Sequence, residues 1–523
     1  MIKYFYLIVA VAVFSANQLS AQLPEDAIRM SWSVPSGTAR NQAIGGAMGS
    51  LGGEITSVFV NPAGIGSYKT SEFVLTPGMS FFGGKASFRG TASTATTDSK
   101  FNIGTTGFVF GQPNTQSRWS SKAFSIAINR TANFNSSTLY RGDNDFSSFS
   151  EAFAEEFANS GLPINTVLYS APLSFGTKLA NWTYLIDTLT ANGATQVVGL
   201  PERDAIINGT DVNLRQEKRI TSKGGITELA FAYAANMDDK LYIGGSLGIP
   251  IVNYERTALM RESDLSGNND NNFKSADYNE VYEASGFGVN AKLGMIVKPS
   301  DKFRAGFAIH TPTIYGLKET TTGYIQTDLE NYLSGGSTSF ANEDTIYSQF
   351  GYNVPTFRYD YFSPWKFLLS GSYVLGGIED VTQQKGFITA DVEYVTHRSS
   401  RFHTADEGGD DSYYDAVNEG VKASYKGAFN FRVGGELKFN TLMTRLGFSY
   451  YGSPYDDSQL KARKMNVSGG LGYRNKGIFV DAAYVLGLNK DVNFPYRLAD
   501  KPNTFATVKD NNSSVVLTVG FKF

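Results

Sequence analysis

Apolar and polar residues alternate with a period of two along most of this chain. In the final ten residues, Ser514–Phe523, every odd position is apolar, and the even positions are mostly small or polar. Successive side chains of a β-strand point to opposite faces, so the pattern predicts a strand with one wholly apolar face. Such a strand, ending on an aromatic residue, is typical of the lipid-facing wall of an outer-membrane barrel.

The same alternation recurs upstream and predicts fourteen strands in all. They are Glu72–Phe82, Phe101–Phe110, Lys122–Asn133, Ile226–Asn236, Leu241–Arg256, Glu280–Lys298, Lys302–Tyr315, Pro364–Val374, Gly386–His397, Lys426–Phe439, Thr444–Tyr451, Met465–Asn475, Gly477–Leu486 and Ser513–Phe523. Mostly longer loops follow the odd-numbered strands, and short turns follow the even-numbered ones, as in outer-membrane barrels. The predicted fold class is all-β transmembrane: a 14-stranded antiparallel outer-membrane β-barrel, with both ends of the wall on the periplasmic side.

Three regions are predicted along the chain. Met1–Ala21 has one cation, a short apolar run and a small-residue cleavage site, which indicates a secretory signal peptide. Gln22–Ser71 is rich in glycine and not strand-like, and its size suits an N-terminal plug, or hatch, inside the lumen. Residues 72–523 then form the barrel, and 134–225 is the longest, partly helical loop.

Composition agrees with a secreted barrel. Gly 54, Phe 38 and Tyr 29 are high counts, while charged residues make up only 18%. The chain has no Cys, which excludes disulfides and thiolate metal sites. With Lys+Arg 46 against Asp+Glu 49, the charge balance gives no electrostatic basis for binding nucleic acid. We expect neither a cofactor nor a metal, and no enzymatic activity.

Charged residues on the predicted lumen face are open to two interpretations. They can form a mutually paired interior network, or one of them can hold an anionic ligand. The residues concerned are Arg432, Glu436, Arg445, Arg474 and Asp481.

The longest predicted loop carries apolar residues at helical spacing. Phe146, Phe149, Phe153 and Phe157 form one stripe, and Trp182, Leu185 and Ile186 form a second patch. These side chains either pack on one another and on the barrel rim, or they contact an apolar ligand.

Several stretches resemble the FadL-type outer-membrane transporters of long-chain fatty acids and other hydrophobic compounds. The resemblance rests on Asn61-Pro62-Ala63-Gly64 in the Gly-rich segment and on Leu179–Asp187, Leu241–Pro250 and Ile296–Thr313. It implies a 14-stranded barrel with a hatch, in which Asn61, Pro62 and Ala63 match the hatch motif. It also implies that ligands come from the extracellular side, pass a loop site and a site near the hatch, and leave sideways through the wall.

The function predicted is passive outer-membrane transport of hydrophobic small molecules such as long-chain fatty acids. The alternatives are a loop-based adhesin, a structural porin, or a barrel hydrolase using one of His310, His397 and His403. The acidic run Asp406–Asp415 is either a solvated loop or a site for a divalent cation. Expected partners are the hydrophobic ligand, outer-membrane lipids and lipopolysaccharide, and the barrel-assembly machinery through the strand ending at Phe523. We expect a monomer.

Overall fold

The computed structural model describes residues 24–34, 36–163, 173–191, 194–334, 336–348, 351–376, 384–405 and 409–523. The predicted signal peptide, Met1–Ala21, lies outside the described residues, and so do Gln22, Leu23 and residues 406–408 of the acidic run.

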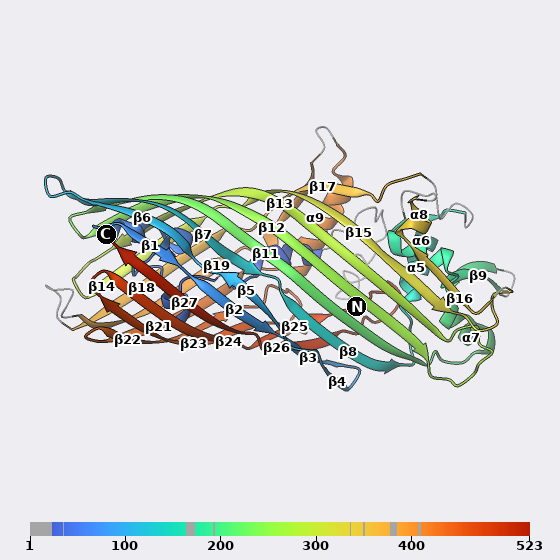
Figure 1. The fold of residues 1–523 in the computed structure, drawn as a ribbon. Coiled ribbons are helices and arrows are strands. Elements are labelled where there is room, and N and C mark those ends of the chain that lie inside the picture. Colours follow the sequence, from blue (N-terminus) through green and yellow to red (C-terminus); the bar gives the residue numbers. More distant parts are fainter. Residues whose placement is uncertain are drawn as a thin grey trace, which may run out of the picture.

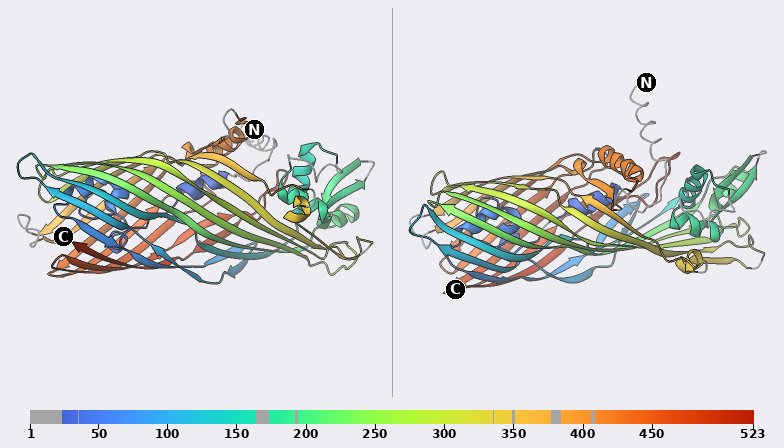
Figure 2. Two further views of the ribbon diagram at one scale, coloured as in Figure 1. Left: turned by 45° about the horizontal axis from the view of Figure 1, so that its top comes forward. Right: turned by 90° about the horizontal axis from the view of Figure 1, so that it is seen from above.

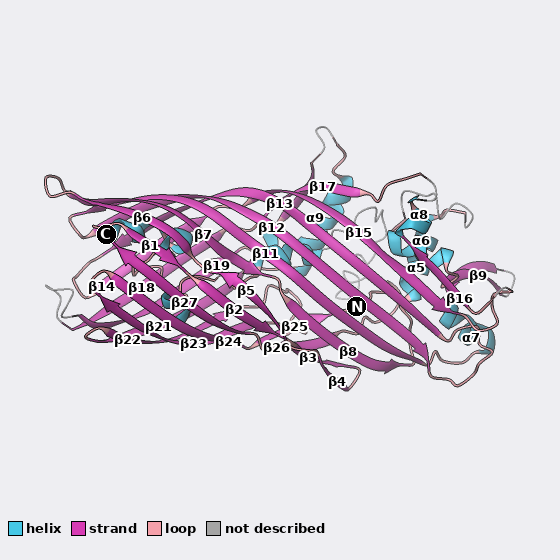
Figure 3. Cartoon of the chain, viewed as in Figure 1, coloured by secondary structure: helices cyan, strands magenta, loops and turns pink. Residues whose placement is uncertain are grey.

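Fourteen antiparallel strands form a closed barrel wall (Figures 1 and 3). In chain order they are β1 and β2 (Glu72–Leu75, Pro77–Phe82), β5 and β6 (Asp98–Ile103, Thr106–Pro113), β7 and β8 (Trp119–Asn133, Ser136–Asn144), β11 (Leu214–Met237), β12 (Leu241–Asp264), β13 (Ser275–Val297), β14 and β15 (Phe303–His310, Ile314–Asp328), β17 and β18 (Thr356–Phe362, Lys366–Gly376), β19 and β20 (Gln384–Val395, Arg401–Thr404), β21 (Ala428–Phe439), β22 (Leu442–Tyr451), β23 (Lys464–Asn475), β24 (Ile478–Gly487) and β27 (Ser513–Lys522). The predicted barrel of fourteen strands is confirmed.

The last strand closes the barrel against the first. β27 pairs with β1 in a register that runs from Glu72↔Lys522 to Leu75↔Val519. At the same end of the barrel, the amide nitrogen of Ser71 lies 3.1 Å from the carbonyl oxygen of Phe523. Short connections cluster at this end, which we call the turn end, and the long connections gather at the opposite loop end (Figure 2).

Several strands continue well beyond their predicted limits towards the loop end. β11 begins at Leu214, whereas the sequence predicted Ile226, and β12 continues to Asp264. The seventh strand likewise continues through β15 to Asp328. The prediction stopped early because the extensions carry polar residues on their outer face, such as Arg215, and this weakens the apolar alternation.

The loop end carries most of the described helices. These are α5 (Ser150–Ser160), α6 (Phe175–Trp182), α7 (Leu200–Asn208), α8 (Glu343–Ile346) and α9 (Ser412–Ser424), with the 3-10 turn η6 (His397–Ser399). The hairpin β9 (Ile186–Ala191) and β10 (Ala194–Gly199) and the edge strand β16 (Thr338–Asn342) are also there. A second small sheet comprises β3 (Gly84–Phe88), β4 (Thr91–Thr94), β25 (Asn489–Asn493) and β26 (Ala506–Asp510). Within the described ranges, no helix is both long and apolar enough to span a membrane.

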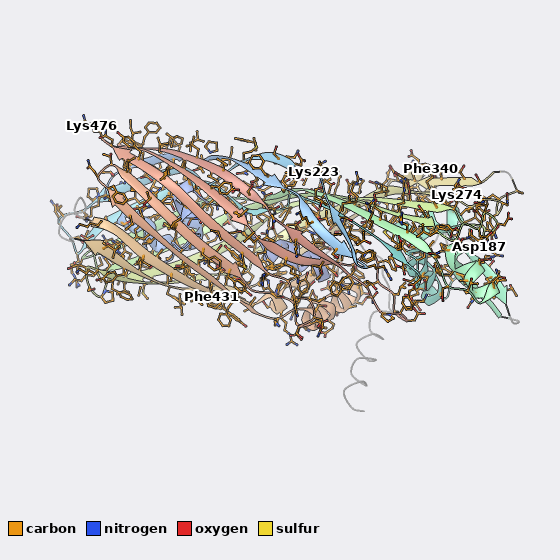
Figure 4. All side chains as sticks on the ribbon, turned by 90° about the horizontal axis from the view of Figure 1, so that it is seen from below. Asp187, Lys223, Lys274, Phe340, Phe431 and Lys476 are labelled. Atoms are coloured by element: carbon orange, nitrogen blue, oxygen red, sulfur yellow. The ribbon has the colours of Figure 1, made fainter. Side chains whose placement is uncertain are left out.

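The outer face of the wall is an apolar belt that ends sharply towards the loop end. On β21, as the sequence predicted, Phe429 and Phe431 are exposed while Asn430 and Arg432 are buried. On strands β12, β13 and β15 the belt ends near Ile251, Phe287 and Ile314. Beyond it the outer face carries cross-strand ion pairs such as Lys223–Glu255, 2.9 Å, and Arg261–Asp277. Figure 4 shows Phe431 on the belt and Lys223 nearer the loop end.

The N-terminal segment, residues 24–71, lies inside the lumen (Figure 1). It contains α2 (Pro24–Ser31), α3 (Ala39–Ala43), α4 (Ser57–Val60) and the 3-10 helix η2 (Pro62–Ser67). α2 packs against α9 and η6 in the loop half of the barrel, whereas η2 packs against β7, β11, β12 and β13. The segment therefore runs through the bore towards the turn end.

A charge placed in the middle of the belt should destabilise the barrel. Leu446 on β22 is 74% exposed on the outer face. We expect Leu446→Arg to lower the free energy of unfolding in lipid bilayers by about 2–4 kcal/mol. Thr257→Arg, on β12 beyond the belt, is the matched control and should change it by less than about 1 kcal/mol. Equal effects in equilibrium unfolding would contradict the assignment of the belt.

Candidate functional site

The N-terminal segment docks on glycines that face inward from the wall. A Cβ at Gly434 would lie 2.2 Å from the carbonyl oxygen of Ile44. A Cβ at Gly306 would lie 2.1 Å from the carbonyl oxygen of Gly49. No side chain tolerates such distances, so glycine is what lets backbone meet backbone here. The wall glycines in contact with the segment include Gly104, Gly111, Gly244, Gly294, Gly306, Gly434, Gly447 and Gly470.

Asn61 of the predicted hatch motif joins the segment to two wall strands. Its side-chain amide donates to the carbonyl oxygen of Gly49 at 2.6 Å, and to those of Met295 and Phe307 at 3.2 and 3.3 Å. Its side-chain oxygen accepts from the amide of Ala63 at 3.2 Å and so caps η2. Asn61 is fully buried, as are Pro62, Ala63 and Gly64. The motif thus folds the segment locally and fixes it to β13 and β14.

Four of the five interior charges predicted from the sequence form ion pairs around this segment. Arg445 lies 2.6 Å from both Glu436 and Asp481, and Arg432 lies 3.3 Å from Glu393. Arg40 of the N-terminal segment lies 3.1 Å from Glu436, which extends the network to that segment. Arg474 stacks on the ring of Phe479, with its guanidinium carbon 5.1 Å from the ring centre. The paired-network interpretation is therefore the one the structure supports.

Above the segment lies a cavity of about 1800 Å³ that continues to the loop end. Its upper part, the aromatic mouth, lies between α5, α6 and β13. The mouth is lined by Phe149, Phe153, Phe175, Tyr278 and Tyr347. The ring centres of Phe153 and Tyr278 are 5.5 Å apart, and those of Phe175 and Tyr347 are 5.8 Å apart. A preformed apolar surface of this kind suits a hydrophobic ligand.

The seven residues proposed from the sequence as ligand contacts fall into three groups. Phe149 and Phe153 line the cavity. Phe157, Leu185 and Ile186 are buried in an apolar core at the loop end, with Trp182 packed against it. Phe146 is 43% exposed and lies under the ammonium group of Lys501, 5.4 Å from its ring centre.

Sequence reasoning missed Phe175, Tyr278 and Tyr347. Phe175 opens α6 directly after Ser174, whose side chain caps the helix. An N-cap residue before an apolar stretch is a recognisable helix signal, and it could have placed Phe175 on a helix. Tyr278 falls within a segment predicted to be a loop, and no local pattern brings it beside Phe153.

The lower part of the cavity, the lower chamber, reaches from the N-terminal segment to the wall. Trp32 and Ser36 of that segment contribute to its floor, and Tyr254 and Tyr282 lie on the β12 and β13 side. The remaining wall is largely polar. It includes the uncharged residues Gln42, Ser80, Asn102, Asn466, Asn512 and Ser514 and the charged residues Arg130, Lys464, Asp491 and Asp510.

The hydrogen-bonded wall is interrupted beside the lower chamber. Among the described strands, β5 pairs only with β2, while β6 pairs with β7 only as far as Thr106↔Ile128. Residues 129–133 of β7 therefore have no wall partner on this side. Ser36 of the N-terminal segment donates instead to the carbonyl oxygen of Arg130, with its amide at 3.1 Å. Ser80, Asn102 and Arg130 line the cavity on both sides of this gap.

The histidines serve the packing of loops and plug. The imidazole of His310 lies 2.9 Å from the carbonyl oxygen of Val60, and that of His403 lies 3.0 Å from Asp411. His397 lies 2.9 Å from the hydroxyl of Ser31, but both residues are buried and outside the cavity lining. In the described part of the chain, no group of three or more His, Asp or Glu side chains is arranged to hold a metal ion.

These features define a class of structure: a closed barrel of fourteen strands, filled by its own N-terminal segment, with a cavity above that segment. No protein-family model matches the sequence, and no curated protein matches it. The structure is similar to that of a Pseudomonas aeruginosa FadL homologue, with 12% identity and a TM-score of 0.53, over 94% of this chain and 100% of that chain. It is also similar to the P. putida toluene transporter TodX, with 12% identity and a TM-score of 0.50, over 93% of this chain and 99% of that chain. The fourteen-stranded barrel that the sequence resemblance implied is thereby confirmed.

Filling an inward glycine should displace the N-terminal segment. Gly434→Leu would bring its side chain against the backbone of Ile44, whereas the nearest atom to a Cβ at the outward Gly469 is a flexible Leu446 side-chain carbon at 3.4 Å. We expect Gly434→Leu to raise single-channel ion conductance in planar bilayers at least several-fold. Gly469→Leu should conduct as the wild type does, and unchanged conductance for both variants would argue against a sealed bore.

The attachment of α5 to residues 494–503 at the mouth should depend on pH. Burial, together with the adjacent Asp500 carboxyl, raises the pKa of Glu155 to about 7 from its ordinary 4.5. Between about pH 4.5 and pH 7, the folded state therefore binds more protons than the unfolded state. The attachment of α5 consequently weakens as the pH rises through this range. Hydrogen exchange of α5 amides should be slower at pH 5 than at pH 8.

Glu155→Gln should remove most of this pH dependence. Glu255→Gln, an outward residue paired with Lys223 at 2.9 Å, is the matched control and should retain it. If the intrinsic exchange rates are accounted for and α5 exchanges equally at both pH values in the wild type, the assignment of Glu155 is wrong.

Proposed function

We propose that the protein is a channel of the bacterial outer membrane through which hydrophobic small molecules diffuse passively. The observation that carries this proposal is the continuous cavity from the aromatic mouth to the gap beside β5. Short turns face the periplasm in outer-membrane barrels, so the turn end is periplasmic and the aromatic mouth faces outward.

The physical need for such a channel is the polar sugar layer of the outer membrane. Exposing apolar surface to water costs about 25 cal/mol per Å². A ligand at the mouth exchanges water for the rings of Phe149, Phe153 and Phe175. The channel therefore shields the ligand where it would otherwise be exposed.

The route proposed from the lower chamber is lateral. Straight passage to the turn end is blocked by the N-terminal segment, which Asn61 and the inward glycines hold against the wall. The gap between β5 and residues 129–133 of β7 leads instead towards the lipid side of the wall. Apolar molecules leaving there would enter the bilayer without meeting bulk water.

The similar structures support the same class of ligand. One is described as a FadL homologue and another as a toluene transporter. An open porin is less compatible with a bore filled by residues 24–71, and a hydrolase is less compatible with the buried Ser31–His397 contact. We further propose that the protein is a monomer without enzymatic activity, surrounded by lipid and lipopolysaccharide, and that barrel-assembly machinery recognises β27.

Uptake of labelled hexadecanoic acid by cells expressing the protein tests the proposal. The wild type should exceed an empty-vector strain, and Phe153→Ser should reduce this excess about tenfold because the mouth loses an apolar contact. Phe146→Ser is the matched control, since Phe146 lies outside the cavity lining, and it should leave uptake unchanged. No excess over the empty vector would refute transport of this ligand class.

The lateral route can be tested with thiol labelling, because the chain contains no native Cys. Asn102→Cys lies at the gap, and Tyr473→Cys lies on the outer face of β23. A bulky thiol reagent should block uptake in the first variant only. Undiminished uptake after complete labelling of Asn102→Cys would exclude this exit.

A further inference from the structure

The chemistry of the cavity changes along its length. Aromatic side chains surround the mouth, whereas polar side chains line the lower chamber beside the gap. Some of these are charged, such as Arg130, Lys464 and Asp510. The uncharged members, which we call the neutral polar set, are Gln42, Ser80, Asn102, Asn466, Asn512 and Ser514. A ligand that follows the proposed route must pass these groups after it leaves the mouth.

Much of the hydrogen-bonding capacity of this set is unused. Within the described residues, the side chains of Asn466 and Ser514 make no hydrogen bond. The side-chain amide of Asn102 donates to the hydroxyl of Ser80 at 2.6 Å, which leaves the Asn102 carbonyl oxygen open. Gln42 likewise donates to the carbonyl oxygen of Gly37 at 2.9 Å and keeps its own oxygen open.

The set differs from the structural polar network deeper in the lumen. There the groups are charged and paired, as in Arg445 with Glu436 and Asp481. In the lower chamber the neutral polar set lies beside charged residues, and Lys464, on the same strand as Asn466, donates to the carbonyl oxygen of Trp32. β23, which carries Asn466, is the twelfth wall strand, and β12, which carries Tyr254, is the fifth, so they lie on opposite sides of a fourteen-stranded barrel.

We propose that the channel selects amphiphiles whose apolar chain carries neutral hydrogen-bonding groups, hydroxyl or amide, over plain chains of equal length. A plain chain displaces water from Asn466, Ser514 and Asn102 without replacing its hydrogen bonds. A chain with a hydroxyl group replaces at least one of them. Sites built to hydrogen-bond a ligand discriminate strongly against analogues that lack the group, because buried polar atoms are then left unpaired.

This inference rests on the proposed function, and it competes with a simpler one. Barrel interiors are commonly polar because they hold water. If the amide and hydroxyl groups only hydrate the chamber, removing them should leave the relative preference between two ligands unchanged.

The test compares hexadecanoic acid with 3-hydroxyhexadecanoic acid, which differ by one hydroxyl group. Equilibrium binding to the purified full-length barrel and uptake by expressing cells are both measured. We expect the wild type to prefer the hydroxylated acid about tenfold, and Asn466→Leu combined with Ser514→Val to reduce the preference to within about twofold. Asn475→Leu, at the exposed turn end of the same strand β23, is the matched control and should keep it.

Each outcome has a distinct meaning. If neither acid binds or enters above the empty-vector level, the proposed function fails. If both enter equally in the wild type, or if the double variant keeps the wild-type preference, the selectivity proposal is overturned while transport stands. Heat-modifiable migration in gels checks that each barrel is folded, and Ser514→Ala provides a milder variant should the double variant misfold.

Discussion

Backbone contact between the barrel wall and the N-terminal segment is the constraint on which the rest of the structure depends. A side chain on any of these wall glycines would intrude on the segment, so the strands have no side-chain packing at those points. In return, the wall approaches the segment closely enough for Asn61 to reach the carbonyl groups of β13 and β14. Hydrogen bonds and ion pairs such as Arg40–Glu436 then fix its orientation.

The docked segment in turn forms part of the cavity above it and of the gap in the wall. Trp32 and Ser36 contribute to the floor of the cavity, and Ser36 occupies the inner side of the gap beside β7. A carbonyl oxygen of Gly37 comes so near to Gly104 that a Cβ there would lie 2.4 Å away. The gap in the wall and the position of the N-terminal segment are therefore linked, because this segment contacts the strands where their pairing is interrupted.

The barrel could be predicted from the sequence because its signal is local. Each strand of the wall alternates between apolar and polar residues, so the fourteen strands could be counted, and the alternation of short turns with long loops agreed with an even number. The extensions of β11 and β12 could not be read in this way, because outside the lipid the outward residues are polar and the period-two contrast fades. Sequence alone also could not reveal the interruption between β5 and β7, which depends on contact with a distant segment.

Only part of the candidate site could be predicted from the sequence, for a similar reason. The stripe containing Phe149 and Phe153 was visible, but helical spacing does not distinguish a residue facing a cavity from one facing a core. Phe157 lies on the same helix and is buried among Leu179 and Leu185. The lower chamber gave no sequence signal, since Asn102, Asn466 and Ser514 come from three strands that meet only once the barrel has closed.

The path of the N-terminal segment constrains how the barrel is assembled. The segment begins against α9 in the loop half and leaves at the turn end, where Ser71 meets Phe523. Its bulk is held between opposite sides of the bore, and drawing it through a finished cylinder would require many buried polar contacts to break together. It follows that the pairing between β1 and β27 forms last in assembly, around an N-terminal segment that is already in place. The strands of the wall then assemble around this segment.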